Sequence, residues 1–187
     1  MVKNGRQQGG GSTTSDWSDP DAVIAGLYDT HARSLVTLAR LFVDHRDAAE
    51  DVVQESFIRL SRSLHRIDDP AKAAAYLRSI VLNLARDHNR RGMLSLRHQS
   101  KRDEFDSVGL EEQIVERSEH RRVLAGVRRL PRRQRDCLAL RYLLELSVAE
   151  IADTLGLSPN SVKTHLKRGL AALRSDADLA SVGEETS

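Results

Sequence analysis

Apolar residues recur at intervals of three and four along most of this chain, which is the spacing that places them on one face of an α-helix. Such segments begin near Asp19-Pro20 and near Asp68-Asp69-Pro70, where an acid can cap a helix and proline can open it. Others cover about 48–64, 111–129 and 131–144. The pattern predicts an all-α protein.

The run from Ser147 to Leu173 predicts two short helices joined by a tight turn. Ser147 and Glu150 have the spacing of a capping box. Gly156 ends the first helix, because glycine adopts left-handed backbone angles at little cost. Ser158 and Pro159 then cap and begin the second helix. The apolar side of that helix carries Val162, Leu166, Gly169, Leu170 and Leu173.

The outward side of this second helix carries hydrogen-bonding residues and bases, and no acid occurs between Ser158 and Arg174. A short capped helix of this composition suits the major groove of DNA. A helical hairpin with a solvated basic face is the simpler alternative. The missing acids and the small residues around the turn favour DNA binding.

Two further polar stripes lie on predicted helices. One faces away from the apolar side of the helix at about 48–64 and consists of Asp51, Gln54, Glu55, Ile58 and Arg62. The other, on the helix after Pro70, includes Asn83, Arg86, Asp87, Arg90 and Arg91. A solvated face is the simpler interpretation of the first stripe. Part of the second has a structural explanation, because arginines near the C-terminus of a helix interact favourably with the helix dipole. Asparagine is only a modest helix former, so its place beside arginines favours a base-reading role.

Composition narrows the class of protein. With 4% aromatic and 30% charged residues, the 187-residue chain favours small helical bundles, as one domain or two. The net charge is only +2, but the charges are segregated. Acids gather between Asp44 and Glu55, whereas six arginines surround the single acid Asp136 in the run Arg128–Arg141.

The sequence contains no motif for several kinds of metal, cofactor or catalytic site. Cys137 is the only cysteine, which excludes an internal disulfide and a cysteine-based zinc site. The seven histidines form no ligand pair, and no phosphate-binding loop or catalytic motif occurs. We therefore expect no metal, no cofactor and no enzymatic activity. We find neither an apolar run that could span a membrane nor a signal-peptide core, so we expect no membrane insertion and a cytoplasmic location.

The predicted domain organisation has five parts. A disordered tail, 1–18, contains Trp17, whose role is open. A first domain covers 19–91, a flexible linker 92–110 and a second domain 111–175. An acidic tail, 176–187, ends the sequence and should fray.

Three segments resemble bacterial sigma factors. AEDVVQESF, at 49–57, is similar to their core-binding signature, and AYLRSIVLNLARDHNRR, at 75–91, is similar to their promoter-melting helix. The segment 130–173 resembles sigma region 4. Regions 2 and 4 joined only by a linker are the layout of the extracytoplasmic-function (ECF) subfamily. The fold implied is a region 2 bundle and a region 4 helix-turn-helix.

The resemblance implies a role for each group of polar residues. The residues expected to bind the β′ clamp helices of core RNA polymerase are Asp51, Gln54, Glu55, Ile58 and Arg62. Those expected at the −10 promoter element are Tyr76, Asn83, Arg86, Asp87, Arg90 and Arg91. Those expected at the −35 element are Ser158, Asn160, Ser161, Lys163, Thr164, Lys167 and Arg168. The apolar surface of region 4 would bind the β flap, and an anti-sigma factor is a further candidate partner.

The chain departs from the family pattern at three positions. Tyr76 stands where many relatives have tryptophan, His31 where an aromatic residue is usual, and Val148 where an aromatic residue is frequent. Stacking of unpaired bases needs flat side chains. The departures therefore leave open which residues hold the −10 bases.

The function expected is promoter-specific transcription initiation by core polymerase, with assistance in opening the −10 element. A linker of about 19 residues spans roughly 25 Å as a coil and about 65 Å when extended. We therefore expect polymerase to hold it extended and the free protein to fold its two domains together. The alternative is a LuxR-type helix-turn-helix regulator without polymerase binding, and an adaptor that binds only proteins is a third possibility. Neither explains all three segments.

Overall fold

The computed structural model describes residues 19–43, 45–67, 69–95 and 123–184, with side chains throughout except at 89–95 and 176–184. Its elements are α1 (Pro20–Arg40), α2 (Arg46–Ser63), the 3-10 helix η1 (Leu64–Arg66), α3 (Pro70–Ser95), a helical segment at 123–129, α5 (Arg132–Leu143), α6 (Val148–Leu155) and α7 (Pro159–Glu184). These ranges contain no strand, so the all-α prediction is confirmed.

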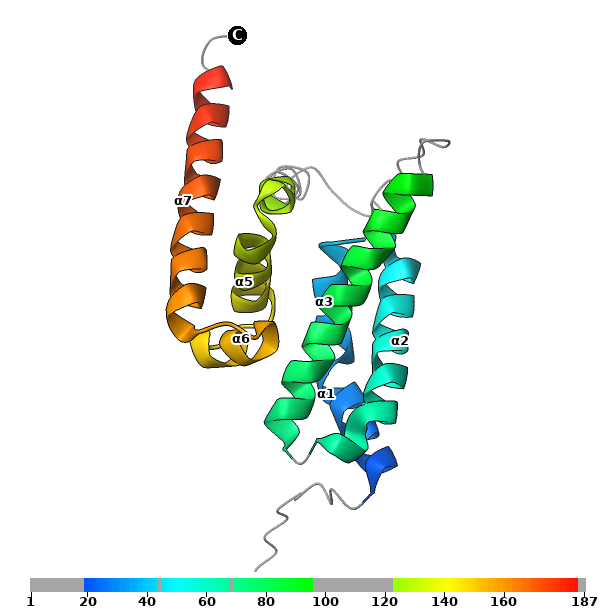
Figure 1. Ribbon diagram of the computed structural model, residues 1–187. Coiled ribbons are helices and arrows are strands. Elements are labelled where there is room, and N and C mark those ends of the chain that lie inside the picture. The colour runs from blue at the N-terminus through cyan, green and yellow to red at the C-terminus, as the bar shows by residue number, and fades with distance from the viewer. Residues whose placement is uncertain (1–18, 44, 68, 96–122, 185–187) are drawn as a thin grey trace, which may run out of the picture.

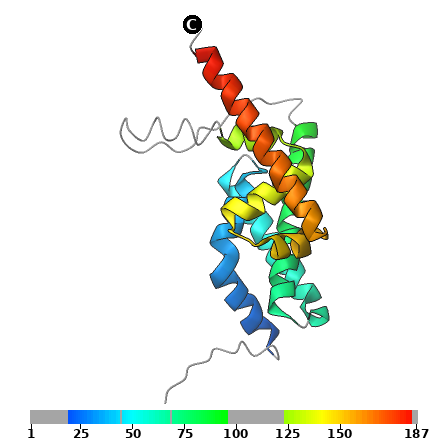
Figure 2. The same cartoon turned by 90° about the vertical axis from the view of Figure 1, so that its left-hand side faces the viewer.

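The helices form two groups, which Figures 1 and 2 show from two directions. We call α1, α2 and α3 the N-terminal bundle. The segment 123–129 with α5, α6 and α7 is the C-terminal bundle. In Figure 1, α2 lies on the side of the molecule farthest from α7. None of the described helices is long and apolar enough to cross a lipid bilayer.

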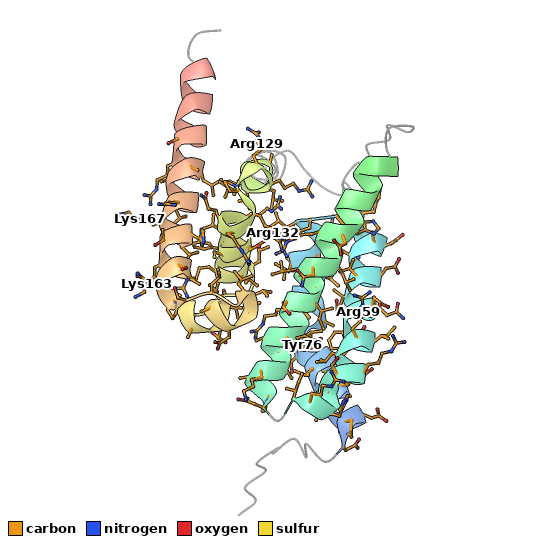
Figure 3. All side chains as sticks on the ribbon, in the orientation of Figure 1. Arg59, Tyr76, Arg129, Arg132, Lys163 and Lys167 are labelled. Atoms are coloured by element: carbon orange, nitrogen blue, oxygen red, sulfur yellow. The ribbon has the colours of Figure 1, made fainter. Side chains whose placement is uncertain are left out.

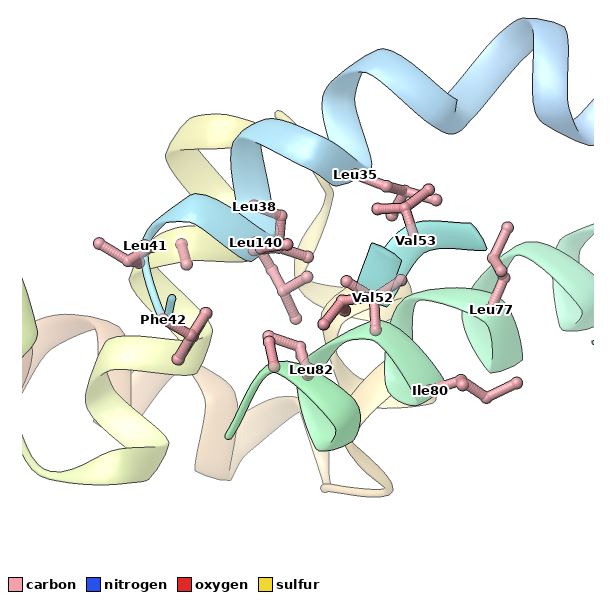
Figure 4. Packing of buried hydrophobic residues seen from close by; sticks show 14 of the residues in the cluster. Leu35, Leu38, Leu41, Phe42, Val52, Val53, Leu77, Ile80, Leu82 and Leu140 are labelled. Atoms are coloured by element: carbon pink, nitrogen blue, oxygen red, sulfur yellow. The ribbon is translucent and has the colours of Figure 1, made fainter. Parts of the chain in front are cut away.

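Aliphatic side chains fill the N-terminal bundle, as the apolar spacing predicts. Leu35 and Leu38 of α1, Leu60 of α2 and Leu77 of α3 are at most 1% exposed, and Figure 4 shows part of this packing. Burying a leucine side chain stabilises a fold by roughly 1.5–3 kcal/mol. Tyr28 shares the apolar spacing of α1 but is 53% exposed, with its ring against that of Phe57.

The predicted helix starts are confirmed by hydrogen bonds. An Asp19 side-chain oxygen accepts from the backbone N–H groups of Asp21 and Ala22, at 3.0 and 3.3 Å. Asp69 accepts from the N–H of Ala71 at 2.8 Å, immediately after Pro70. These carboxylates satisfy N–H groups that a helix leaves unpaired at its start.

The turn between α6 and α7 is built as the sequence predicts. The Ser147 hydroxyl accepts from Glu150 N at 3.2 Å, and Ser147 N donates to the Glu150 carboxylate at 2.8 Å. The bond from Ser147 N to the carboxylate lowers the pKa of Glu150. Gly156 takes the left-handed conformation, with φ of 62°. A Cβ at Gly169 would lie 2.8 Å from Leu138 Cδ1, so glycine allows α7 to approach α5 closely.

The two bundles pack against each other along two pairs of helices. α3 lies against α6, and α1 lies against α5. Leu140 of α5 is fully buried, and Figure 4 shows it beside Leu38 of α1 and Leu82 of α3. The Arg128 guanidinium also donates to the carbonyl oxygens of Leu41 and Arg40, at 3.1 and 3.0 Å. The free chain thus has its two halves folded together, as expected.

Two helices extend beyond their expected ends. α3 continues to Ser95, so residues 92–95, assigned to the linker, are helical. One glycine, here Gly92, costs a helix only about 1 kcal/mol and does not have to end it. α7 continues to Glu184, through most of the expected acidic tail. The tail 1–18 with Trp17, the linker residues 96–110 and the start of the 111–129 helix lie outside the described residues. The domain division therefore stays a prediction.

The turn at Gly156 leads to a test with two glycines that should respond in opposite directions. Gly156→Ala should lower the free energy of unfolding by about 1 kcal/mol, since a Cβ is strained at positive φ. Gly26→Ala, within α1, should raise it by up to about 1 kcal/mol, because alanine favours helix. Apart from the local backbone, no atom lies within 4 Å of an added Cβ at either position. Chemical denaturation followed by circular dichroism measures both, and a shift in the same direction would contradict the assigned role of Gly156.

Candidate functional site

The outward surface of α7, which we call the α7 face, is presented by the first turns of that helix. Asn160, Lys163, Thr164, Lys167 and Arg168 are exposed, and Ser161 is half-buried. Val162, on the opposite side, is fully buried and fixes the rotation of the helix. Figure 3 shows Lys163 and Lys167 pointing away from the N-terminal bundle. The side of α7 rich in bases is therefore open to a large anionic partner.

Several of the polar groups on the α7 face already have local partners. The Ser158 hydroxyl accepts from Ser161 N at 3.1 Å and lies 2.9 Å from the Ser161 hydroxyl. Thr164 donates to the backbone oxygen of Asn160 at 3.0 Å. Ser158 thus serves first as the helix cap. The exposed side chains of this face best placed to reach a partner are the amide of Asn160 and the bases Lys163 and Lys167.

The α2 stripe, formed by Asp51, Gln54, Glu55, Ile58 and Arg62, lies on the surface of the N-terminal bundle. Four of these residues are exposed, including Ile58, a large hydrophobic side chain that is 40% exposed. Glu55 is half-buried and pairs with Arg59 at 2.7 Å. An exposed isoleucine among polar residues suits a protein partner better than water.

A groove between α1 and α2 adjoins the α2 stripe. It has a volume of about 760 Å³, and its lining includes Gln54, Val36, Arg40 and the exposed Tyr28. Tyr28 has the helical spacing of the buried residues of α1, yet its side chain is exposed. Its exposure makes it an additional candidate for contact with a partner.

The α3 stripe, formed by Tyr76, Asn83 and Asp87, is the exposed ridge of α3. Tyr76 is 41% exposed, and the other two residues are exposed as well. Seven and then four residues separate them, so they share one helix face. Arg90 and Arg91 continue the helix, but their side chains lie outside the described residues. A phenol ring, an amide and a carboxylate are thus displayed in one row.

Arg86 does not share this exposed ridge, although the sequence places it with these residues. Its Nη2 lies 2.7 Å from Asp136 Oδ2 in α5, and Nη1 donates to Asn83 Oδ1 at 3.0 Å. The Arg86 side chain is 13% exposed, and that of Asp136 is fully buried. Burial lowers the pKa of Arg86, whereas the charge of Asp136 raises it. The C-terminal bundle therefore covers a residue expected to contact DNA.

The other side chains at the contact between the bundles were not predicted from the sequence. The Phe42 ring lies under the guanidinium groups of Arg86 and Arg135, 5.7 and 5.0 Å from its centre. Two signals could have indicated the contact. Asp136 is the single acid in an arginine-rich run, and Leu82 is an apolar residue on the outward side of α3.

A polar cavity of about 330 Å³ also lies between the bundles and is lined by His31, Arg78 and Glu150, among others. Arg78 is only 8% exposed. Burial lowers its pKa, and the charge of Glu150 opposes that shift. The pKa of His31 is lowered by burial and then by the charge of Arg78, which favours the neutral ring.

An apolar groove of about 340 Å³ lies on the C-terminal bundle. Its lining includes Val123, Leu124, Tyr142 and Leu173. Val123 is 59% and Tyr142 is 61% exposed. Large apolar side chains exposed together indicate a surface for another protein.

The described residues contain no group of three or more histidine, cysteine or acidic residues that could hold a metal ion. Cys137 is fully buried, and burial followed by the charge of Asp136 raises the pKa of its thiol to about 11. A protonated, inaccessible thiol is a poor nucleophile. Its surroundings assign Cys137 to packing.

Comparison with known proteins matches both halves of the chain to one family. Residues 27–93 match the model of Sigma-70 region 2, and residues 120–173 match the model of Sigma-70, region 4. The ECF RNA polymerase sigma factor SigL of Mycobacterium tuberculosis is 31% identical over 82% of this chain and 88% of its own length. RNA polymerase sigma factor SigV of Bacillus subtilis is 28% identical over 82% of this chain and 90% of its own length.

A solved structure, that of CnrH in complex with the cytosolic domain of CnrY, resembles the fold. It superposes with a TM-score of 0.64 at 26% identity, over 86% of this chain and 90% of CnrH. The order of the two matched regions and the outward polar stripes of α2, α3 and α7 agree with the sequence similarity. This chain belongs to the sigma-70 family of RNA polymerase sigma factors, in its extracytoplasmic-function subfamily.

Proposed function

We propose that this sigma factor binds core RNA polymerase through the α2 stripe, reads the −35 element with the α7 face and opens the −10 element with α3. The observation that supports this most directly is the exposure of all three surfaces, each on the sigma region expected to carry it. A LuxR-type regulator would not account for the α2 stripe or for the match to region 2.

The α7 face has the chemistry of a major-groove reader. Lys163, Lys167 and Arg168 can contact phosphates, which supplies affinity without sequence information. The Asn160 amide, in the first turn of the helix, can donate and accept hydrogen bonds at a base edge. The position of the face on the outside of the C-terminal bundle lets it approach duplex DNA without rearrangement.

The α3 stripe would act on single-stranded DNA at the −10 element. Unstacking a base costs a few kcal/mol, which a protein can offset by stacking and hydrogen bonding. Tyr76 offers the flat ring, and Asn83 offers an amide for a base edge. No covalent chemistry is assigned to the chain, so its part in opening is to bind the unpaired bases.

Core polymerase would meet two surfaces of the chain. The polar α2 stripe with Ile58 at its centre would dock on the β′ clamp helices. The apolar groove around Tyr142 and Val123 offers a site for the β flap. CnrH is bound to the cytosolic domain of CnrY, and we propose that an anti-sigma factor binds this chain as well. Because core polymerase and promoter DNA are its partners, we propose that the protein acts in the bacterial cytoplasm.

Run-off transcription with purified core polymerase tests the function. On genomic promoter fragments, addition of this protein should stimulate initiation from specific sites. A control with the protein but without core polymerase should yield no transcript. Binding to the same fragments without stimulation of core polymerase would instead support the LuxR-type alternative.

The α2 stripe is tested by replacing two of its exposed residues. Asp51→Ala with Gln54→Ala should abolish co-purification with core polymerase and leave the circular-dichroism spectrum unchanged, because neither side chain is buried. A matched control, Asp29→Ala with Thr30→Ala, removes one acid and one neutral polar side chain from exposed positions on α1. Loss of helical signal in the first variant would show that the stripe supports the fold.

The α7 face is tested by the salt dependence of DNA binding. Lys167→Ala should weaken binding to mixed-sequence duplex DNA and reduce the slope of log K against log salt by about 0.9, the value for one lost phosphate contact. Arg33→Ala, which removes an exposed charge from α1, should leave the slope unchanged. Asn160→Ala should change sequence preference more than the slope. An unchanged preference would show that Asn160 does not read bases.

A further inference from the structure

The contact between the two bundles involves a residue that the proposed function requires elsewhere. Arg86 reaches from α3 to the buried carboxylate of Asp136 in α5, at 2.7 Å, and at the same time donates to Asn83 of the α3 stripe. It can contact DNA only if this arrangement changes. The same guanidinium thus links the closed contact of the bundles to the surface proposed for the −10 element.

The attraction between Arg86 and Asp136 acts between two charged groups that are largely removed from water. Asp136 is fully buried, and within the described residues its ionic partners are Arg86 and, at 3.9 Å, the largely exposed Arg132. No hydrogen bond within good geometry satisfies either carboxylate oxygen in that part of the chain. Removing two ions from water costs nearly as much as their attraction returns. Such a pair fixes how the bundles dock but can be exchanged for another counter-ion.

The closed arrangement leaves the other two binding surfaces free. Helices α2 and α7 lie on opposite sides of the molecule (Figures 1 and 3), and most residues of the α2 stripe and the α7 face are exposed. Arg86 is covered in the closed arrangement, so its proposed contact with the −10 element requires the bundles to separate.

We propose that Arg86 and Asp136 form an autoinhibitory latch, and that the DNA backbone opens it by replacing Asp136 as the counter-ion of Arg86. This inference rests on the proposed function for its DNA partner, but the closed state itself does not. Phosphate oxygens suit a guanidinium in geometry and charge. When the latch opens, Asp136 regains water and the Asn83 amide loses its contact with Arg86. Opening of the latch therefore separates the bundles and also makes the Asn83 amide of the α3 stripe available to a base.

Energy transfer between two dyes tests the closed state in the absence of polymerase and DNA. Ala25→Cys in α1 and Ala171→Cys in α7 provide exposed labelling sites, in a background where Cys137→Ala removes the native thiol. Asp136→Asn should raise the ratio of open to closed molecules by about a hundredfold or more, the order expected when a buried ion loses its partner. Glu50→Gln, which breaks the exposed pair with Arg46, is the matched control and should change nothing.

A charge reversal distinguishes a specific pair from general destabilisation. Arg86→Asp alone and Asp136→Arg alone should each open the molecule, and the two together should close it again. Should Asp136→Asn fold poorly, Arg86→Gln breaks the pair from the other side. Energy transfer that stays at the parent value in these single variants, or that the double reversal does not restore, would overturn the latch.

Single-stranded DNA of mixed sequence tests the exchange of counter-ions. Asp136→Asn should bind this probe several-fold more tightly than the parent protein, whereas Arg86→Gln should open without that gain. Equal gains in both variants would overturn the role of DNA in releasing Arg86. Run-off transcription separates the two proposals. If transcription is not stimulated while the charge reversal restores closure, the proposed function fails and the closed pair of residues stands.

Discussion

The burial of α3 on two sides is the constraint on which the rest of the structure depends. Leu77 and Val81 belong to the core of the N-terminal bundle, whereas Arg78, Leu82 and Arg86 follow one another at intervals of four on the side that meets the C-terminal bundle. Only a narrow ridge remains for a partner. Every change in how the bundles dock therefore alters the surroundings of the residues proposed to meet the −10 element.

Local chemistry explains what could be predicted from the sequence. The caps at Asp19 and Ser147 and the left-handed turn at Gly156 depend on residues within one helical turn, and the apolar spacing identifies the inward faces. Tyr28 shows the limit of spacing, because periodicity gives the direction of a face but not how much of it a neighbour covers. Leu82 and Arg86 are buried by the C-terminal bundle, which begins only after residue 122; the spacing of α3 can mark Leu82 as unusual, but it does not identify the helix that covers it.

The net charge of +2 conceals two kinds of ion pair with different roles. The pairs Arg46–Glu50 and Arg59–Glu55 lie on the exposed surface of α2, where solvent screens them and each contributes little to stability. The pair of Arg86 with Asp136 is buried and joins separate parts of the chain. Arginine suits this position better than lysine, because a planar guanidinium can lie over the Phe42 ring while pairing with a carboxylate.

Each of the two small helical bundles has little stability of its own, so losing the contact with the other bundle is costly. Domains of this size bury a smaller fraction of their surface than larger ones, so each apolar contact counts for more. Leu38, Leu82 and Leu140 meet where the bundles join, and separation exposes part of that apolar surface to water. Partners that engage the separated bundles must offset this loss. The surfaces proposed for polymerase and for duplex DNA, the α2 stripe and the α7 face, stay exposed in the closed form. Under that proposal both partners bind before the bundles separate, and the energy of those contacts is then available to drive opening.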